Sequence, residues 1–447
     1  MSLRGTKQSR TLDNPVCISG DCRAIARNDK KVIFFISLIL LITVQALAQS
    51  PYTNQVFKPE IKSVEFYNSK KDPSFPIIKL NSGEQLLLAF DNLQGGTRNY
   101  YYTIEHCDDA WNSSNLSPAE YLQSFTEDQI RDYSYSTATL QKYTHYELKF
   151  PNSNLAPKLS GNYILKVYED GDRSKMVITQ RFYVLDSKIS ITGEVVPSAD
   201  IPSKQTNQKI NFQINYGALR VQNPGYDIRT LIMQNERPET AQISSQPASI
   251  RGTQLVYNDL STNDFQGRNE FRHFDTRSLK VNSERISHIY RDTANTVILL
   301  TDPTLDQPNY SFFYDNDGNF YINNQDGSDP HVDADYAHMY FSLASTKPGG
   351  DGSAYIVGKF NNYRLDEASK LEYDAAKNRY YTQLLLKQGV YDYAYVWVPN
   401  NTHKPDDAYF EGSHFETENN YQMLVYYKPA GARWTELVGY QVLTTKK

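Results

Sequence analysis

The sequence is poor in cysteine and tryptophan, and it has no excess of positive charge. Its 447 residues include 3 Cys and 3 Trp, and 46 Lys and Arg against 51 Asp and Glu give a formal net charge of −5. A nucleic-acid-binding protein is expected to carry a basic stripe or a strongly basic domain, so this balance argues against nucleic acid as a partner. With only 22 Gly and 20 Pro, the chain also lacks the composition of a low-complexity, disordered protein. We therefore expect a globular protein of several domains.

The chain also lacks an apolar run that could span a membrane once it is processed. The apolar stretch Val32–Val44 is shorter than the roughly 20 residues that cross a bilayer. Lys30 and Lys31 precede it, and Ala46 and Ala48 follow it as a small-x-small cleavage site, which is typical of a secretory signal peptide. An uncleaved membrane anchor is the alternative. We expect residues 1–48 to be a leader and signal peptide, and the mature chain to be exported without a membrane span.

Cysteine is almost absent from the expected mature chain. Cys17 and Cys22 precede the apolar stretch, so Cys107 alone remains after cleavage. A lone cysteine forms no disulfide within its chain, so packed cores must hold this exported protein together. We interpret Cys107 as a small buried hydrophobe rather than a nucleophile or a ligand.

Motifs that carry catalysis are absent as well. The sequence contains no G-x-S-x-G elbow, H-E-x-x-H pair, C-x-x-C pair or Walker loop. The acidic segment 326–335, with His331 inside it and His338 beyond it, lacks the spacing of a calcium loop, and we interpret it as a polar connector. We interpret Asp315–Asn319 as a turn. Carboxylates are abundant, so an enzyme with an unrecognised pair of acids remains an alternative. The prediction is a protein that is not an enzyme and holds neither a cofactor nor a metal ion.

What the sequence does contain is alternation of apolar and polar residues with a period of two. Short runs rich in β-branched and aromatic residues are bounded by Gly, Pro, Asn or Asp, which is typical of strands. Clear examples are Ile61–Tyr67, Thr144–Phe150, Gly161–Glu169 and Met176–Leu185. No long segment has a helical period, so the prediction is an all-β protein made of multidomain antiparallel β-sandwiches.

The distribution of tyrosine predicts where these domains begin and end. Residues 49–188 contain 13 Tyr, residues 189–309 contain 4, and residues 310–447 contain 18. Separate domains explain such a swing better than one continuous core. We predict an N-terminal β-sandwich at 49–188, a middle β domain at 189–309 and a C-terminal immunoglobulin-like β-sandwich at 310–447. In the last of these, Tyr310–Tyr314 and Phe320–Ile322 are expected to form a hairpin around Gly318.

One predicted strand carries a row of aromatic residues. The side chains of Tyr391, Tyr393, Tyr395 and Trp397 alternate with smaller ones and therefore share one face. Packing over a sandwich core is the favoured interpretation of this row. If it faces outward instead, it is a ligand platform, since an aromatic face binds sugars or bases. The four residues are therefore the candidate partner or ligand surface.

The C-terminal third resembles a known fold. The segment Ser353–Tyr363, which reads SAYIVGKFNNY, and the later Gly389–Tyr393, which reads GVYDY, are similar to the glycogen-binding and early-set immunoglobulin-like domains. The resemblance implies an early-set β-sandwich. Tyr363 stands where these relatives have Trp, so the implied sugar binding does not carry over with the fold. A carbohydrate-binding protein that uses the strand from Tyr391 to Trp397 is the alternative function.

The order of the whole chain resembles a narrower family. A signal peptide, an N-terminal domain with the motif Tyr102–Trp111 (YTIEHCDDAW), a polar middle and the segment around Gly358–Tyr363 follow one another. In this the chain resembles the plug proteins of the type IX secretion system of Bacteroidota. The resemblance implies a noncatalytic protein in the periplasm, associated with the outer membrane through its partner. That partner is the large outer-membrane translocon β-barrel. The resemblance implies that the protein closes the periplasmic opening of this barrel when the translocon is idle.

Overall fold

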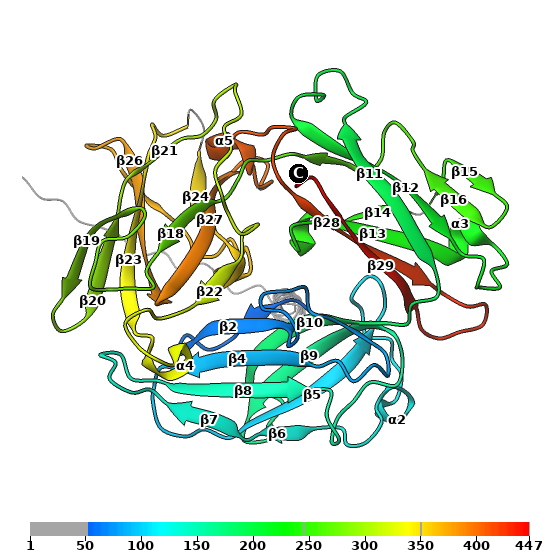
Figure 1. Ribbon diagram of the computed structural model, residues 1–447, viewed down its shortest axis with the longest axis horizontal. Coiled ribbons are helices and arrows are strands. Elements are labelled where there is room, and N and C mark those ends of the chain that lie inside the picture. The colour runs from blue at the N-terminus through cyan, green and yellow to red at the C-terminus, as the bar shows by residue number, and fades with distance from the viewer. Residues whose placement is uncertain (1–51, 245, 349–350, 447) are drawn as a thin grey trace, which may run out of the picture. The chain divides into compact units, whose positions relative to one another are not determined.

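The computed structural model describes residues 52–244, 246–348 and 351–446. They belong to one compact unit, and almost all of its regular structure is β-sheet (Figure 1). The prediction of an all-β protein with several antiparallel sandwiches is confirmed. The predicted signal segment, with Ala46 and Ala48, lies outside the described residues. No helix within the described ranges is long and apolar enough to cross a membrane.

The first sandwich comes from the N-terminal part of the described chain. Its elements are β1 (Gln55–Val56), β2 (Ile61–Asn68), β3 (Ile77–Lys79), β4 (Leu86–Asn92), β5 (Tyr100–Cys107), α2 (Pro118–Tyr121), β6 (Asp128–Ile130), β7 (Asp132–Tyr135), β8 (Thr144–Phe150), β9 (Gly161–Glu169) and β10 (Met176–Leu185). One sheet has the order β1-β10-β9-β5-β6, with β3 alongside β10, and the other has the order β2-β4-β8-β7. The bounds of β8, β9 and β10 are those predicted from the alternation.

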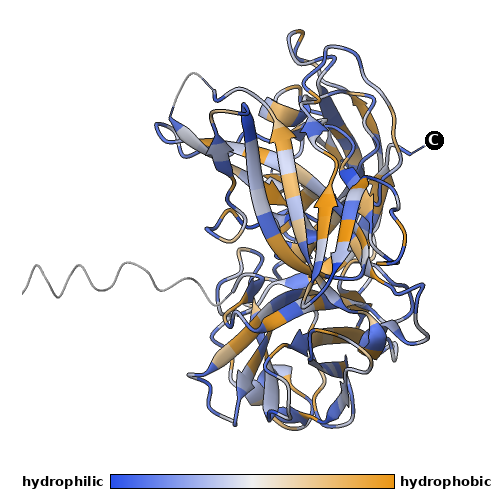
Figure 2. Ribbon diagram, turned by 90° about the vertical axis from the view of Figure 1, so that its left-hand side faces the viewer, coloured by the Kyte–Doolittle hydropathy of each residue, from blue (hydrophilic) through white to orange (hydrophobic). Residues whose placement is uncertain are grey.

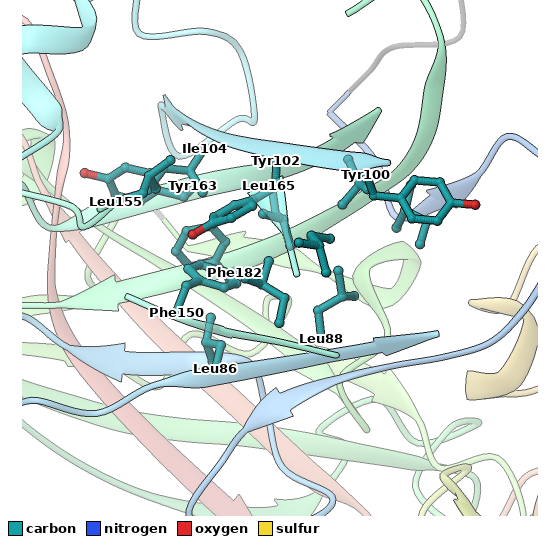
Figure 3. Packing of buried hydrophobic residues seen from close by; sticks show 14 of the residues in the cluster. Leu86, Leu88, Tyr100, Tyr102, Ile104, Phe150, Leu155, Tyr163, Leu165 and Phe182 are labelled. Atoms are coloured by element: carbon teal, nitrogen blue, oxygen red, sulfur yellow. The ribbon is translucent and has the colours of Figure 1, made fainter. Parts of the chain in front are cut away.

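Side chains from both sheets of the first sandwich meet in one core. Figure 3 shows Leu86 and Leu88 of β4 on the side facing Tyr102 of β5 and Phe182 of β10, and all four belong to one buried cluster. Full burial of such a side chain stabilises a fold by about 1.5–3 kcal/mol. Tyrosine fits this core because its hydroxyl can reach a hydrogen-bond partner. Asn152 Nδ2, for example, donates to the Tyr102 hydroxyl at 2.8 Å. In Figure 2, hydrophobic and hydrophilic residues interleave along the strands, as the period of two requires.

The second sandwich combines two distant parts of the chain. Its elements are β11 (Ser190–Pro197), β12 (Asn207–Asn215), α3 (Pro224–Asp227), β13 (Ile228–Gln234), η1 (Pro238–Thr240), β14 (Gln242–Ser244), β15 (Ser249–Arg251), β16 (Gln254–Tyr257), β17 (Asp264–Gln266), β28 (Asn420–Tyr427) and β29 (Glu436–Thr444). The sheet β11-β12-β16-β15, with β17 beside β12, packs on the sheet β14-β13-β28-β29. Because β28 and β29 pair here, the strands do not follow the predicted division at 309/310.

The third sandwich is formed by the chain between these two parts. Its elements are β18 (Arg272–Asp275), β19 (Ile286–Arg291), β20 (Asn295–Leu299), β21 (Asp302–Pro303), β22 (Phe320–Ile322), α4 (Pro330–Asp333), β23 (Tyr336–Ala344), β24 (Gly352–Val357), η2 (Lys359–Asn361), β25 (Glu372–Asp374), β26 (Arg379–Lys387), β27 (Gly389–Pro399) and α5 (Ala408–Glu411). The strands β18, β24 and β22 pair with β27, and the other sheet has the order β19-β20-β23-β26-β25, with β21 alongside β23. Strands β18 to β21, predicted to lie in a middle domain, thus belong to this sandwich.

The predicted hairpin of Tyr310–Tyr314 with Phe320–Ile322 is wrong. Residues 310–314 form no strand, and β22 pairs with β27 instead. The reason is the buried Asp392 of β27, whose carboxylate accepts hydrogen bonds from the backbone amides of Asn316 and Gly318. This holds the turn Asp315–Asn319 against β27, so the predicted turn is present but it connects no hairpin.

The sheet of β13 and β28 is buried on both faces. Ile228 and Ile232 face the core of the second sandwich, whereas Leu231 and Met233 belong to a cluster with Phe75, Tyr183 and Leu185 of the first sandwich. Apolar residues at successive positions are typical of a strand without a solvent face. The first and second sandwiches are therefore joined through an apolar interface.

Candidate functional site

The predicted aromatic surface lies inside the third sandwich. The exposed fraction is 1% for Tyr391 and Tyr393, 0% for Tyr395 and 4% for Trp397. The hydroxyls of Tyr393 and Tyr395 donate to Asp302 Oδ2 at 2.8 and 2.9 Å. The structure thus corrects the idea of an exposed platform, because the row faces the opposite sheet and packs in the core. The carbohydrate-binding alternative loses its surface with it.

A buried ionic group surrounds these tyrosines. Arg272 lies 2.8 Å from Glu411 Oε2 and 3.3 Å from Asp302 Oδ1, and all three side chains are at most 5% exposed. Burial alone would lower the pKa of Arg272, but Glu411 and Asp302 raise it. The pKa of Glu411 is raised by burial, against the effect of Arg272. Each charge has a partner and the group is closed to solvent, so it offers no access to a substrate, and the loss of one partner would leave a buried charge unpaired.

A second buried polar group joins the first sandwich to the third. The Lys387 ammonium and the Tyr336 hydroxyl each donate to Asp91 Oδ2 at 2.7 Å, and His145 Nδ1 lies 2.7 Å from Asp91 Oδ1. Asp91 and Lys387 are each 1% exposed. We call Asp91, His145, Tyr336 and Lys387 the junction cluster. Burial by itself would raise the pKa of Asp91, but Lys387 and His145 lower it, so the carboxyl is ionised at neutral pH.

Local strand pairing places the four residues. Asp91 of β4 and His145 of β8 are direct cross-strand partners, and so are Tyr336 of β23 and Lys387 of β26. Cross-strand partners share one face of a sheet, so each sandwich presents a ready pair. The two pairs meet although 296 positions separate Asp91 from Lys387.

Further hydrogen bonds support the same junction. The backbone amides of Leu140 and Gln141 donate to the Asp335 carboxylate at 2.7 and 3.1 Å. The Tyr143 hydroxyl donates to the carbonyl of Ala334 at 2.8 Å, and the Lys387 ammonium lies 4.1 Å from the centre of the Tyr143 ring. The loop before β8 is thus fixed to the start of β23.

Three side chains, one of which belongs to the junction cluster, could hold a metal ion. They are His145, Glu147 and His331, whose ligand atoms lie within 4.8 Å of one another. In the sequence, His331 lies in the acidic segment 326–335 and His338 lies just beyond it. The structure separates them, because His338 is hydrogen-bonded to Gln383 and the His331 ring lies 4.9 Å from that of His145.

The other singled-out residues are structural. Cys107 is buried, and burial raises the pKa of its thiol to about 12, so it is not a nucleophile at neutral pH. Burial and the nearby Asp392 carboxylate raise the pKa of Asp315 to about 8. Asp315 accepts hydrogen bonds from the amides of Phe271 and Asp317, which fits a turn rather than a cation loop.

Aromatic side chains are exposed at a place that the sequence did not single out. Tyr133 and Tyr135 of β7 are 44% and 53% exposed, and their rings lie 5.8 Å apart. In the described part of the chain, β7 pairs with β8 alone and is therefore an edge strand of its sheet. Both faces of β7 are exposed along its whole length. We call Tyr133 and Tyr135 the β7 pair.

Comparison with known proteins identifies relatives of the chain. The model of the type 9 secretion system plug protein 1st domain matches residues 61–186, which is the first sandwich from β2 to β10. A crystal structure of a hypothetical protein from Parabacteroides merdae ATCC 43184 is 33% identical, with a TM-score of 0.85, and the match covers 89% of this chain and 100% of that one. No curated protein matches the chain.

These findings bear on family and on role. The family match supports a plug role associated with the type 9 secretion system, and with it a structural rather than an enzymatic task. The similarity over the full solved relative indicates that the arrangement of all three sandwiches is shared with that protein. By its first sandwich, this chain belongs to the type 9 secretion system plug protein family.

Proposed function

We propose that the protein is exported to the periplasm, binds the outer-membrane translocon β-barrel of the type 9 secretion system and occludes its periplasmic opening when no substrate is passing. The observation that carries this proposal is the match of residues 61–186 to the first domain of the plug proteins. A wide barrel with an aqueous lumen leaks unless something fills or covers it. The proposed task is therefore binding and blocking, without chemistry.

The way the sandwiches are joined supports such a task. Domains joined by small polar interfaces are expected to move relative to one another. Here an apolar cluster joins the first and second sandwiches, and the buried junction cluster joins the first and third. Domains that are held firmly together can block an opening, whereas loosely linked domains would move apart and leave it open.

We further propose that the β7 pair contacts the translocon. Tyr133 and Tyr135 belong to the sandwich that the family model matches, and they are exposed on an edge strand. Tyrosine is enriched at protein interfaces because its ring provides a large contact area and its hydroxyl a hydrogen bond. An edge strand also offers unpaired backbone groups to a partner strand.

A copurification experiment tests this contact. The tagged protein, isolated from outer-membrane extracts, should recover a very large β-barrel. The double variant Tyr133→Ala/Tyr135→Ala should weaken the affinity by about tenfold or more, since aromatic side chains at interface centres often contribute about 2 kcal/mol each.

The matched control is Tyr226→Ala, which removes a tyrosine that is 75% exposed on the second sandwich. We expect it to recover as much barrel as the wild type. Equal loss in both variants would refute the assignment of the β7 pair, and recovery of no barrel by the wild-type protein would refute the proposed partner.

A further inference from the structure

His145, Glu147 and His331 bring three metal-ligating groups together at the junction of the first and third sandwiches. His145 and Glu147 are two residues apart on β8 and so point to the same face of their sheet. His331 is contributed by α4 of the third sandwich. His145 Nε2 lies 3.4 Å from Glu147 Oε1, and His331 Nδ1 lies 3.8 Å from the same oxygen. A cluster of this kind has no part in the proposed plugging.

The His145 ring has a buried nitrogen without a hydrogen bond. Its side chain is 6% exposed, and within the described residues Nε2 is buried and has no hydrogen-bond partner. A buried polar atom left in this way costs about 1–3 kcal/mol, so such atoms are rare without a reason. This nitrogen lies 3.4 Å from Glu147 Oε1, where it makes an ion contact but no hydrogen bond, and it thus lies among the three ligand groups.

The other nitrogen of the same ring is held by a carboxylate. His145 Nδ1 lies 2.7 Å from Asp91 Oδ1, and Asp91 is fixed in turn by Lys387 and Tyr336. When Nδ1–H donates to a carboxylate, the lone pair on Nε2 points outward and the ring becomes a better ligand.

The backbone around His331 is fixed from both sandwiches. The Asp329 side chain accepts from the amide of His331 at 3.1 Å, and the Lys387 ammonium donates to the His331 carbonyl at 3.1 Å. The amide of Thr137, in the first sandwich, donates to the carbonyl of Val332 at 2.8 Å. The third ligand is therefore carried by a positioned turn.

The geometry and the donor set agree on the kind of ion. Ligands in a tetrahedral zinc site lie about 2.1 Å from the ion and hence about 3.4 Å from one another. Two of the separations, 3.4 and 3.8 Å, are close to this value. Two imidazoles with one carboxylate suit zinc and similar transition metals, whereas calcium and magnesium take oxygen ligands.

We propose that His145, Glu147 and His331 bind a divalent transition-metal ion of the zinc class, which ties β8 of the first sandwich to α4 of the third. Water completes the coordination, because three protein ligands leave one tetrahedral position free. Glu147 and His331 are 31% and 43% exposed, so the ion has a path from solvent. The proposed metal site does not depend on the proposed plug role, so either proposal can be wrong while the other is right.

Zinc titration of the metal-stripped full chain tests the site. Cys17 and Cys22 belong to the same chain and can also bind zinc, so the decisive quantity is the difference between wild type and variants. We expect His331→Ala to lower the affinity of one zinc site by at least about tenfold. Even the loss of a residue that only hydrogen-bonds to a metal ligand has an effect of this size. His338→Ala, in the other histidine of the region, should leave that affinity unchanged.

A thermal measurement and a second variant guard against an unfolded protein. Zinc should raise the Tm of the wild type and of His338→Ala, and it should do so much less for His331→Ala and Glu147→Gln. Both substituted side chains are partly exposed, so the variants are expected to fold. Equal zinc affinity and equal stabilisation of the wild type and His331→Ala would overturn the proposal, and so would a wild-type chain that binds no zinc at micromolar concentration.

Discussion

Replacing Lys387 by Met is expected to lower the free energy of unfolding by about 3–5 kcal/mol. The substitution keeps most of the side-chain volume but leaves the Asp91 carboxylate in the interior without its ammonium partner. Tyr336 and His145 still reach Asp91, but neither replaces the bond from the Lys387 ammonium to Asp91 Oδ2. Urea denaturation of the wild type and the Lys387→Met variant measures the difference.

An exposed ion pair supplies the control. In the pair of Lys175 with Asp170, the side chains are 48% and 57% exposed, so Lys175→Met should cost less than about 1 kcal/mol. The double variant Asp91→Asn/Lys387→Met should cost less than the sum of its single changes, because no unpaired charge remains buried. If Lys387→Met is no more costly than Lys175→Met, the junction cluster is not the buried, paired group described above.

The second large effect is expected for Tyr393→Ala in the core of the third sandwich. Removal of a buried aromatic side chain costs about 3–5 kcal/mol, because it leaves a cavity as well as less apolar burial. Tyr393 is 1% exposed and its hydroxyl bonds to Asp302, so both its ring and its polar end are lost. Tyr393→Phe, which keeps the ring, should cost about 1.5–3 kcal/mol for the bond to a charged group. Thermal or urea unfolding separates the two variants.

Tyr381 on the adjoining sheet is the matched residue. It is 40% exposed and bonds to Glu372 at the surface, so Tyr381→Ala should change the stability by about 0.5 kcal/mol at most. A Tyr393→Ala variant that unfolds like the wild type but loses binding to a glycan would contradict the core packing of this row. It would restore the platform that the sequence offered as an alternative.

These two sites show what alternation along a sequence can and cannot predict. The period of two located strands well, as β8 at Thr144–Phe150 illustrates. It also placed Tyr391 and Tyr393 on one face, but a period says only which residues share a face and not what covers it. Both faces of β27 are covered, because the row packs in the main core of the third sandwich and Val396, on the other face, packs in a second cluster. Hence the pattern could not show whether this aromatic row faces solvent or the core.

Contacts between residues that are distant in the sequence could not be predicted either. Strand β28 pairs with β13 along its length, although almost 200 residues lie between them, and no local feature of either strand names the other. Asp91 follows the apolar run of β4 and Lys387 follows three leucines at the end of β26, which is a weak signal for a buried charge, but nothing in the sequence pairs them. His331 was noticed with its neighbour His338, whereas its ligand-competent neighbours lie on β8. The family resemblance, by contrast, was visible in the motif Tyr102–Trp111, within the matched first sandwich.

Outer-membrane permeability tests the proposed plugging most directly. A strain that lacks this protein but retains the translocon should take up a large antibiotic that the wild type excludes, because the barrel then stands open. Removing the translocon as well should restore the barrier, as should returning the wild-type gene. Unchanged uptake in the single deletion, with the translocon present in the membrane, would contradict the proposal that this protein closes it.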